Sequence, residues 1–315
     1  MNKPKYESIT IGTRGSALAL WQANWVKSEL ERQYPGIEVA LEIIKTKGDK
    51  ILDVPLAKVG GKGLFVKEIE DAMLAGRIDL AVHSMKDVPT ELPDGLQVAI
   101  IPPREDPRDA FFSRENRKLA ELAPGAVVGT SSLRRKAQLL NAFPHLEIRD
   151  LRGNVDTRLK KLDRGDYDAI ILAAAGVKRL GWAERITEIL APEISLPAIA
   201  QGALGIETRI DDNFNNQRLA FFHDTKTALA VRAERALLKT LEGGCQVPIA
   251  AHATVSADNE LTLTGLVAAL DGREIIKEKI SGKKPEELGV KLAQTLLQRG
   301  ADRLLEECLE INGGR

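Results

Sequence analysis

Arginines, one aspartate and one cysteine are the residues of this sequence whose types and positions suggest chemistry. Between Ser131 and Lys160 there are seven Lys or Arg and three Asp or Glu, although the whole chain has 45 of each and is formally neutral. Planar guanidinium groups bind carboxylates and phosphates in bidentate fashion. A basic cluster inside a neutral chain therefore predicts a site for a small acidic molecule.

Two segments place hydroxyl groups and arginines at the start of an expected helix. Thr13-Arg14-Gly15-Ser16 precedes one helix, and Gly129-Thr130-Ser131-Ser132-Leu133-Arg134-Arg135 begins another. Backbone N–H groups at a helix start attract anions, whereas arginines in the first turn oppose the helix dipole unless an anion binds there. The alternatives are a simple serine cap at Ser16 and a solvated arginine face at 134–135.

Further arginines are expected at strand ends and helix starts along one rim of a sheet, namely Arg152, Arg158 and Arg179. The sequence has only three Trp, three Tyr and seven Phe, and its basic cluster lacks interleaved aromatic residues. Both this and the neutral net charge argue against a nucleic-acid partner.

The segment His83-Ser84-Met85-Lys86-Asp87-Val88-Pro89 follows a short apolar run that is typical of a buried strand. A carboxylate held in a cleft beside cations can transfer a proton or stabilise a developing positive charge, which makes Asp87 a candidate catalytic residue. The alternative is an ordinary surface pair of Lys86 and Asp87. We expect His83 to be structural.

Two glycine-containing loops are also candidate functional segments. Cys245 follows Gly243-Gly244 and precedes Pro248, so its thiol is either a nucleophile or attachment point on a shaped loop, or a small buried apolar group. The basic loop 56–63, with Lys58 and Lys62, is either a lid over an anionic ligand or an ordinary loop. Four His and two Cys show no metal-ligand spacing, so no metal is expected.

These residues need an alternating framework to position them. Strand-like runs at 8–12, 37–45, 79–83, 127–129, 146–148 and 168–172 alternate with helical runs at 17–33, 64–75, 132–142 and 155–163. The pattern predicts an α/β fold with a largely parallel sheet. Proline-rich stretches at 102–107 and 191–197 would join two lobes that enclose a cleft.

The last third of the sequence has a different pattern. A helix at 225–241, strands at 249–255, 260–267 and 274–280 and one long helix at 285–310 predict a small α+β domain. We expect Cys308 to be buried in that last helix.

The sequence also limits where the protein works. The longest apolar run, 169–177, is shorter than the roughly 20 residues of a membrane span, and residues 1–7 lack the apolar core of a signal peptide. Two cysteines are too few for a disulfide scaffold. We therefore expect a cytoplasmic protein with reduced thiols and no membrane partner.

Taken together, the motifs resemble the hydroxymethylbilane synthase (porphobilinogen deaminase) family, in which segments like these occur in the same order: Thr13–Ser16, Val59–Gly63, His83–Asp87, Ser131–Arg135, Leu151–Asn154 and Gly243–Cys245. The resemblance implies two α/β lobes like those of type II periplasmic binding proteins plus a smaller C-terminal α+β domain. Residues 1–102 and 203–220 would form the first lobe, 103–202 the second, and 221–315 the third domain, which carries the cysteine.

The resemblance also implies a function. A transferase of this family condenses four porphobilinogen molecules, with loss of ammonia, into the linear tetrapyrrole hydroxymethylbilane, on a dipyrromethane cofactor attached to Cys245 by a thioether. Asp87 would assist loss of the amine and stabilise the positive charge. Lys86, Ser132, Arg134 and Arg135 would bind the cofactor, Arg14, Ser16, Arg152, Arg158 and Arg179 the substrate and growing chain, and Lys58 and Lys62 would lie on the lid.

A monomer is implied as well. The competing interpretation is a two-lobed anion-binding module without catalysis, which leaves Asp87 and the Cys245 loop without a role.

Overall fold

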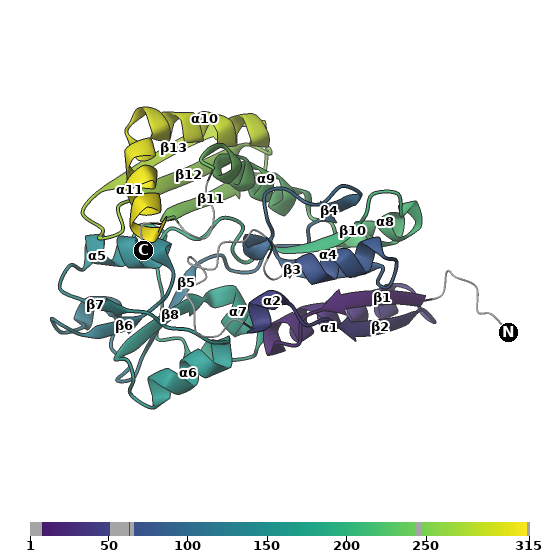
Figure 1. Cartoon of the computed structure of the whole chain (residues 1–315), viewed down its shortest axis with the longest axis horizontal. Helices are drawn as coiled ribbons and strands as arrows, with labels where there is room; N and C mark the ends of the chain where they lie inside the picture. The colour runs from purple at the N-terminus through teal and green to yellow at the C-terminus, as the bar shows by residue number, and fades with distance from the viewer. Residues whose placement is uncertain (1–7, 51–62, 64–65, 243–246, 314–315) are drawn as a thin grey trace. The chain divides into compact units, whose positions relative to one another are not determined.

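The computed structural model describes residues 8–50, 63, 66–242 and 247–313. These residues form two compact units (Figure 1). Unit 1 comprises the described residues within 1–53, 61–104 and 203–228, and unit 2 those within 105–202 and 229–315. Lys58, Lys62 and Cys245 lie outside the described residues.

Unit 1 contains a five-stranded sheet in the order β2-β1-β3-β10-β4. Strand β1 is parallel to β2 and β3, whereas β10 is antiparallel to both β3 and β4, so a single strand is reversed. The strands are β1 (Ser8–Thr13), β2 (Glu38–Ile43), β3 (Leu80–Ser84), β4 (Leu96–Ile100) and β10 (Leu204–Arg209). The prediction of a largely parallel sheet is confirmed here.

Helices α1 (Ala17–Gln33), α2 (Lys47–Lys50), α4 (Lys67–Leu74) and α8 (Asn213–Leu219) belong to the same unit, with 3₁₀ turns at Met85–Asp87 and Ala220–Phe222. Apolar residues of β1, β3 and β10 pack against Val26 and Leu30 of α1. Ser16 caps α1 because its Oγ accepts a hydrogen bond from the N–H of Ala19 at 3.3 Å. The packed sheet thus fixes the turns at 14–16 and 85–87.

Unit 2 contains a second five-stranded sheet, in the order β7-β6-β8-β5-β9, and β5 is its one reversed strand. The strands are β5 (Asp109–Ser113), β6 (Val127–Gly129), β7 (Glu147–Arg149), β8 (Ala169–Ala173) and β9 (Glu188–Ile189). Its helices are α5 (Leu133–Ala142), α6 (Val155–Asp163) and α7 (Ala174–Arg179), with 3₁₀ turns at Leu119–Glu121 and Ala183–Arg185. Phe111 and Phe112 of β5 enter separate cores.

Unit 2 also holds a three-stranded antiparallel sheet, formed by β11 (Ile249–Val255), β12 (Leu261–Ala268) and β13 (Ile275–Gly282). Helices α9 (Thr225–Thr240), α10 (Pro285–Gln298) and α11 (Ala301–Gly313) complete the last third of the chain. The prediction of one long helix over 285–310 is wrong, because Gly300 has φ +95° and separates α10 from α11. Cys308 is 1% exposed, as expected.

The described chain is therefore a mixed α/β structure with two five-stranded sheets and a smaller C-terminal sheet-and-helix part. The division into 1–102 with 203–220, 103–202 and 221–315 stays a prediction. Among the described residues, no helix is both long and apolar enough to span a membrane.

Candidate anion-binding site

The first turn of α5 carries the two adjacent arginines. The Oγ of Ser132 caps the helix by accepting a hydrogen bond from the backbone N–H of Arg135 at 3.4 Å. Arg134 and Arg135 are only 5% and 6% exposed. The alternative of a solvated arginine face is therefore wrong, since the amphipathic helix turns this face toward the sheet.

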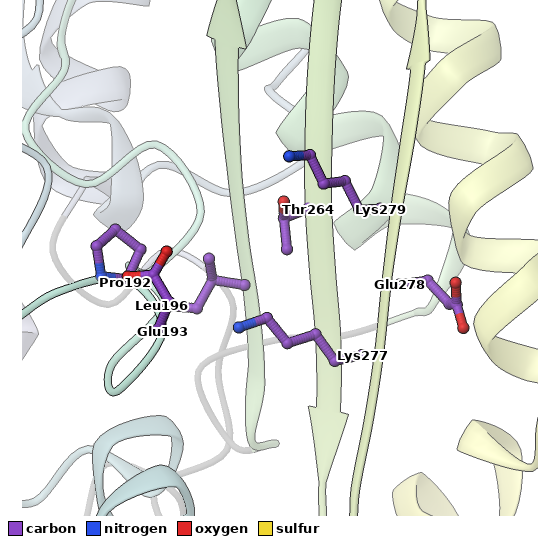
Figure 2. Close-up of a pocket in the computed structure, with 7 residues that line it drawn as sticks. All are labelled: Pro192, Glu193, Leu196, Thr264, Lys277, Glu278 and Lys279. Atoms are coloured by element: carbon purple, nitrogen blue, oxygen red, sulfur yellow. The ribbon is translucent and has the colours of Figure 1, made fainter.

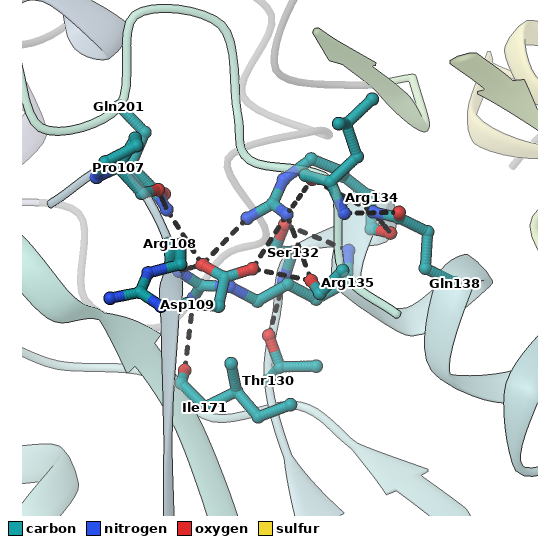
Figure 3. Close-up of polar contacts among 12 residues, drawn as sticks. Pro107, Arg108, Asp109, Thr130, Ser132, Arg134, Arg135, Gln138, Ile171 and Gln201 are labelled. Carbon is teal, nitrogen blue, oxygen red and sulfur yellow. Dashed lines mark hydrogen bonds and ion pairs between the residues drawn. The ribbon is translucent and has the colours of Figure 1, made fainter. Parts of the chain in front are cut away.

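Asp109, the first residue of β5, binds both guanidinium groups (Figure 3). Its carboxylate accepts hydrogen bonds from Nη1 and Nη2 of Arg134 at 2.8 and 3.2 Å, and from Nη2 and Nε of Arg135 at 2.7 and 3.1 Å. Burial alone would raise the pKa of Asp109, but the charges of Arg134 and Arg135 hold that pKa well below its usual range. Asp109 is therefore a buried carboxylate anion.

Neighbouring groups fasten this network. Ser195 Oγ and Gln201 Nε2 donate to Asp109 at 2.7 and 2.9 Å. The carbonyl of Leu196 accepts from Nη1 of Arg134 at 2.7 Å, and the carbonyl of Ile171 accepts from Nη1 of Arg135 at 3.1 Å. Both arginines are thereby held in fixed orientations.

The formal charges in this network do not balance. Two guanidinium groups surround one carboxylate, and the charges that act most strongly on the pKa values of Arg134 and Asp109 belong to these three residues. Burial lowers the pKa of Arg134, and the charge of Arg135 lowers it further, although Asp109 opposes both effects. A second anion would relieve this buried excess of positive charge.

Three more predicted arginines belong to unit 2. Arg152 and Arg158 are half-buried, and Nε of Arg158 donates to the carbonyl of Gly153 at 2.7 Å. Arg179 ends α7 with 9% exposure, and its Nη2 donates to the carbonyl of Gly202 at 2.8 Å. Burial lowers the pKa of Arg179 to about 10, although Glu105 partly offsets this effect.

Unit 1 carries Arg14, Ser16, Lys86 and Asp87. The side chains of Lys86 and Asp87 are exposed on the 3₁₀ turn that follows β3. The N–H of Met85 donates to the carbonyl of Ala203 at 3.0 Å, which anchors that turn to the chain entering β10. Arg14 and Ser16 are half-buried at the turn before α1.

A second buried charge cluster lies at the base of the Asp87 turn. His83 on β3 and Glu207 on β10 are 7% and 1% exposed, and His83 Nε2 lies 2.8 Å from Glu207 Oε2. Glu70 on α4 is 6% exposed, and burial, followed by the charge of Glu207, raises its pKa to about 7. The burial of His83 and its contact with Glu207 support the expectation of a structural histidine.

The sequence analysis missed Asp109, Ser195 and Gln201. The signal for Asp109 is an acidic residue directly before the apolar run Ala110-Phe111-Phe112, at the position where a strand enters the core. Ser195 and Gln201 lie outside strands and helices, and no spacing connects them to residue 109.

A cavity of about 410 Å³ in unit 2 shares Leu196 with the Asp109 network (Figure 2). It is lined by Pro192, Glu193, Leu196, Thr264, Lys277, Glu278 and Lys279, and includes none of the predicted site residues. Lys277 and Lys279 extend to the same side of the sheet as Thr264, whereas Glu278 points the other way and pairs with Arg299. Because these lysines are exposed on a sheet face, they do not form a preorganised binding site.

The described residues contain no group of three or more His, Cys, Asp or Glu side chains placed to hold a metal ion. The fold is α/β, and the buried arginine pair makes the start of α5 a candidate site for a small acidic ligand.

Comparison with known proteins identifies the family. Residues 9–217 match the model described as "Porphobilinogen deaminase, dipyromethane cofactor binding domain", and residues 228–298 match "Porphobilinogen deaminase, C-terminal domain". The porphobilinogen deaminase of Pelobacter propionicus is 62% identical over 95% of this chain and 96% of its own. That of Geobacter sulfurreducens is 61% identical over 95% of this chain and 94% of its own. The chain therefore belongs to the porphobilinogen deaminase family.

Among solved structures, the periplasmic VFT2 domain of BvgS from Bordetella pertussis aligns with 68% of this chain and 86% of its own, at 12% identity and a TM-score of 0.41. The extracellular-binding protein YtmK from Bacillus subtilis aligns with 68% and 89%, at 13% identity and a TM-score of 0.41.

Family membership makes this chain an enzyme, and its matched residues 9–217 are those of the family's cofactor-binding domain. The interpretation as a binding module without catalysis is not favoured.

Proposed function

We propose that this chain condenses four molecules of porphobilinogen into hydroxymethylbilane, with loss of one ammonia at each condensation, on a dipyrromethane primer attached to Cys245. The observation that carries the proposal is the buried, positively charged Asp109–Arg134–Arg135 network within a member of the porphobilinogen deaminase family. Each porphobilinogen unit has two carboxylates, so the growing chain becomes more anionic with every step.

The described residues fit such a cofactor. The network at the start of α5 has two guanidinium groups and one carboxylate, and a bound carboxylate would bring it close to neutrality. When bound, the dipyrromethane supplies the pyrrole onto which the new units are joined. Arg134, Arg135, Ser132 and Lys86 would hold its carboxylates.

The remaining roles follow the positions of the side chains. The exposed carboxylate of Asp87 accepts a proton or stabilises positive charge that develops during loss of ammonia, and the backbone bond between Met85 and Ala203 holds its turn in place. The substrate carboxylates would bind Arg14, Ser16, Arg152, Arg158 and Arg179. Lys58 and Lys62 would cover the bound chain.

We extend the proposal to organisation and location. Residues 221–315 would form the third domain, which presents the cysteine, while 1–102 with 203–220 and 103–202 form the two lobes. The presence of only two cysteines supports a reduced, cytoplasmic enzyme. Its partner would be porphobilinogen alone, and the enzyme would be a monomer.

Intact-protein mass spectrometry tests the attachment. The purified, active enzyme should exceed the mass of its sequence by one covalent dipyrrole, because a thioether survives denaturation. Cys245→Ser should lack this addition, while the matched variant Cys308→Ser, which changes the buried cysteine of α11, should retain it. An active preparation with the bare sequence mass would overturn the proposal.

A further inference from the structure

Asp109 connects three separate segments of unit 2. Its side chain is fully buried, and it accepts hydrogen bonds from Arg134 and Arg135 of α5 and from Ser195 and Gln201 of the segment before β10. Six hydrogen bonds from these four residues fix the position of the carboxylate and of its donors. This arrangement exists within the protein itself, before any ligand is considered.

Fixing the arginines has a consequence for binding. A free arginine side chain has several rotatable bonds and loses conformational entropy when a ligand immobilises it. Arg134 and Arg135 have already lost that freedom, because Asp109, Leu196 and Ile171 hold their guanidinium groups. Their preorganisation removes an entropic cost that a ligand carboxylate would otherwise meet.

The charge of Asp109 also matters. With Asp109 ionised, the two arginines and the aspartate carry one net positive charge in a buried setting. Without the carboxylate, two adjacent guanidinium charges would face each other unneutralised, which is costly at low dielectric. Asp109 thus lowers the energetic cost of burying two adjacent arginines. It leaves one positive charge that a bound anionic group would neutralise.

We infer that Asp109 is a positioning residue for cofactor assembly: it orients Arg134 and Arg135 and leaves one of their charges to bind a cofactor carboxylate. Because Asp109 is fully buried, we expect it to act through the two arginines. This inference rests on the proposed function, since it concerns the same arginines.

Asp109→Asn and Ser195→Ala test it in the full chain. Each variant is made in the unloaded form and mixed with porphobilinogen, and intact mass then follows the covalent addition with time. We expect Asp109→Asn to load at least about tenfold more slowly than the unchanged chain. Ser195→Ala, which keeps the charge but removes the 2.7 Å donor to Asp109, should load about two- to fivefold more slowly.

Three comparisons separate positioning from mere stability. Far-ultraviolet circular dichroism establishes that each unloaded variant is folded, and Asp109→Glu should recover part of the loading rate by restoring the charge. Asp166→Asn, which removes an exposed ion pair with Arg164 from the same unit, should load at the unchanged rate. If Asp109→Asn does not fold, the loading rate of Ser195→Ala tests whether Asp109 positions the arginines.

The outcomes are distinct. If folded Asp109→Asn loads at the unchanged rate, the role of Asp109 is overturned and the proposed function remains intact. If Asp109→Asn does not fold, the same conclusion follows from a folded Ser195→Ala that loads at the unchanged rate. If the unchanged chain itself acquires no covalent addition and forms no tetrapyrrole, the proposed function fails instead.

Discussion

The two units contain buried charge clusters of opposite imbalance, each with an acidic residue on the reversed strand that is fourth in its sheet. In unit 1, the reversed strand β10 contributes Glu207, which lies with Glu70 around the single imidazole of His83. In unit 2, the reversed strand β5 contributes Asp109, which lies between two guanidinium groups. One cluster has an excess of carboxylates and the other an excess of cations.

The two excesses are relieved differently. A surplus carboxylate can take up a proton, and burial together with the charge of Glu207 raises the pKa of Glu70 to about 7, which favours this near neutral pH. An arginine does not release its proton in the physiological range, so the unit 2 cluster cannot relieve its excess in that way. The proposed cofactor carboxylate would supply the missing negative charge. The comparison therefore supports the proposed ligand-binding role of the unit 2 cluster and gives no corresponding reason for an anion at the unit 1 cluster.

Asp87→Asn should have the largest effect, because it removes the carboxylate proposed to stabilise positive charge during the reaction. The buried cluster of Glu70, His83 and Glu207 in unit 1 is not changed by this substitution. We expect turnover to fall by about 10²-fold or more. The cofactor should remain attached and the unfolding midpoint unchanged, since Asp87 is exposed. Steady-state kinetics and intact mass measure these quantities.

Asp94→Asn is the matched control, because it neutralises another exposed aspartate of unit 1 and should leave turnover unchanged. Near-normal turnover of Asp87→Asn would show that the turn after β3 does not contribute the catalytic carboxylate.

His83→Leu should have the next largest effect, and it acts on stability. The change removes the partner of Glu207 Oε2, and among the described residues Glu207 Oε1 already has no hydrogen-bond partner. A buried carboxylate without a partner costs about 2–4 kcal/mol of unfolding free energy. The measurement is the urea dependence of circular dichroism.

The double variant His83→Leu with Glu207→Leu should recover most of that loss, because two apolar side chains can replace a buried polar pair. If the double variant is no more stable than the single one, the His83–Glu207 contact is not what stabilises this part of unit 1.

The sequence predicted the elements better than the contacts between them. Helices 17–33 and 155–163 and strand 249–255 coincide with the structure, because periodicity is a local property of the chain. Strands β4, β5 and β9 and helix α7 were missed, since they are short and lack clear alternation, and the residues 174–179 continue an apolar run from β8. The interruption at Gly300 was also missed, although its glycine is in the sequence.

The site was predicted in the same uneven way. Ser16 caps α1 and Ser132 caps α5, at helix starts that the sequence indicated, and Arg134 and Arg135 lie together in the first turn of α5. Their burial was not predictable, because it depends on Asp109, 25 and 26 residues earlier in the chain, and on Ser195, 86 residues after Asp109. The spacing of residues along the sequence does not reveal such long-range charge pairs. It does not reveal the proximity of Glu70 to Glu207 either.

Glu70→Gln should have the smallest effect. It tests whether protonation of Glu70 relieves the excess of buried carboxylates in unit 1. The charged and titratable groups that influence Glu70 are Glu207, His83, Asp71 and Lys67. Its folded pKa, about 7, lies above the value of 4.5 expected for an unfolded chain. The stability contributed by protonated Glu70 is therefore fully present below pH 4.5 and is lost as the pH rises through about 7.

Because glutamine stays neutral, Glu70→Gln should gain stability relative to the unchanged chain between about pH 5 and pH 8, by roughly 1–3 kcal/mol at the upper end. Urea unfolding at half-unit pH steps measures the difference. Asp94→Asn, which changes an exposed carboxylate of unit 1 that is not among the groups influencing Glu70, should not alter the slope over this range. Parallel curves for Glu70→Gln and the unchanged chain would mean that unit 1 tolerates its carboxylates as anions, and the contrast with the arginine pair of unit 2 would then disappear.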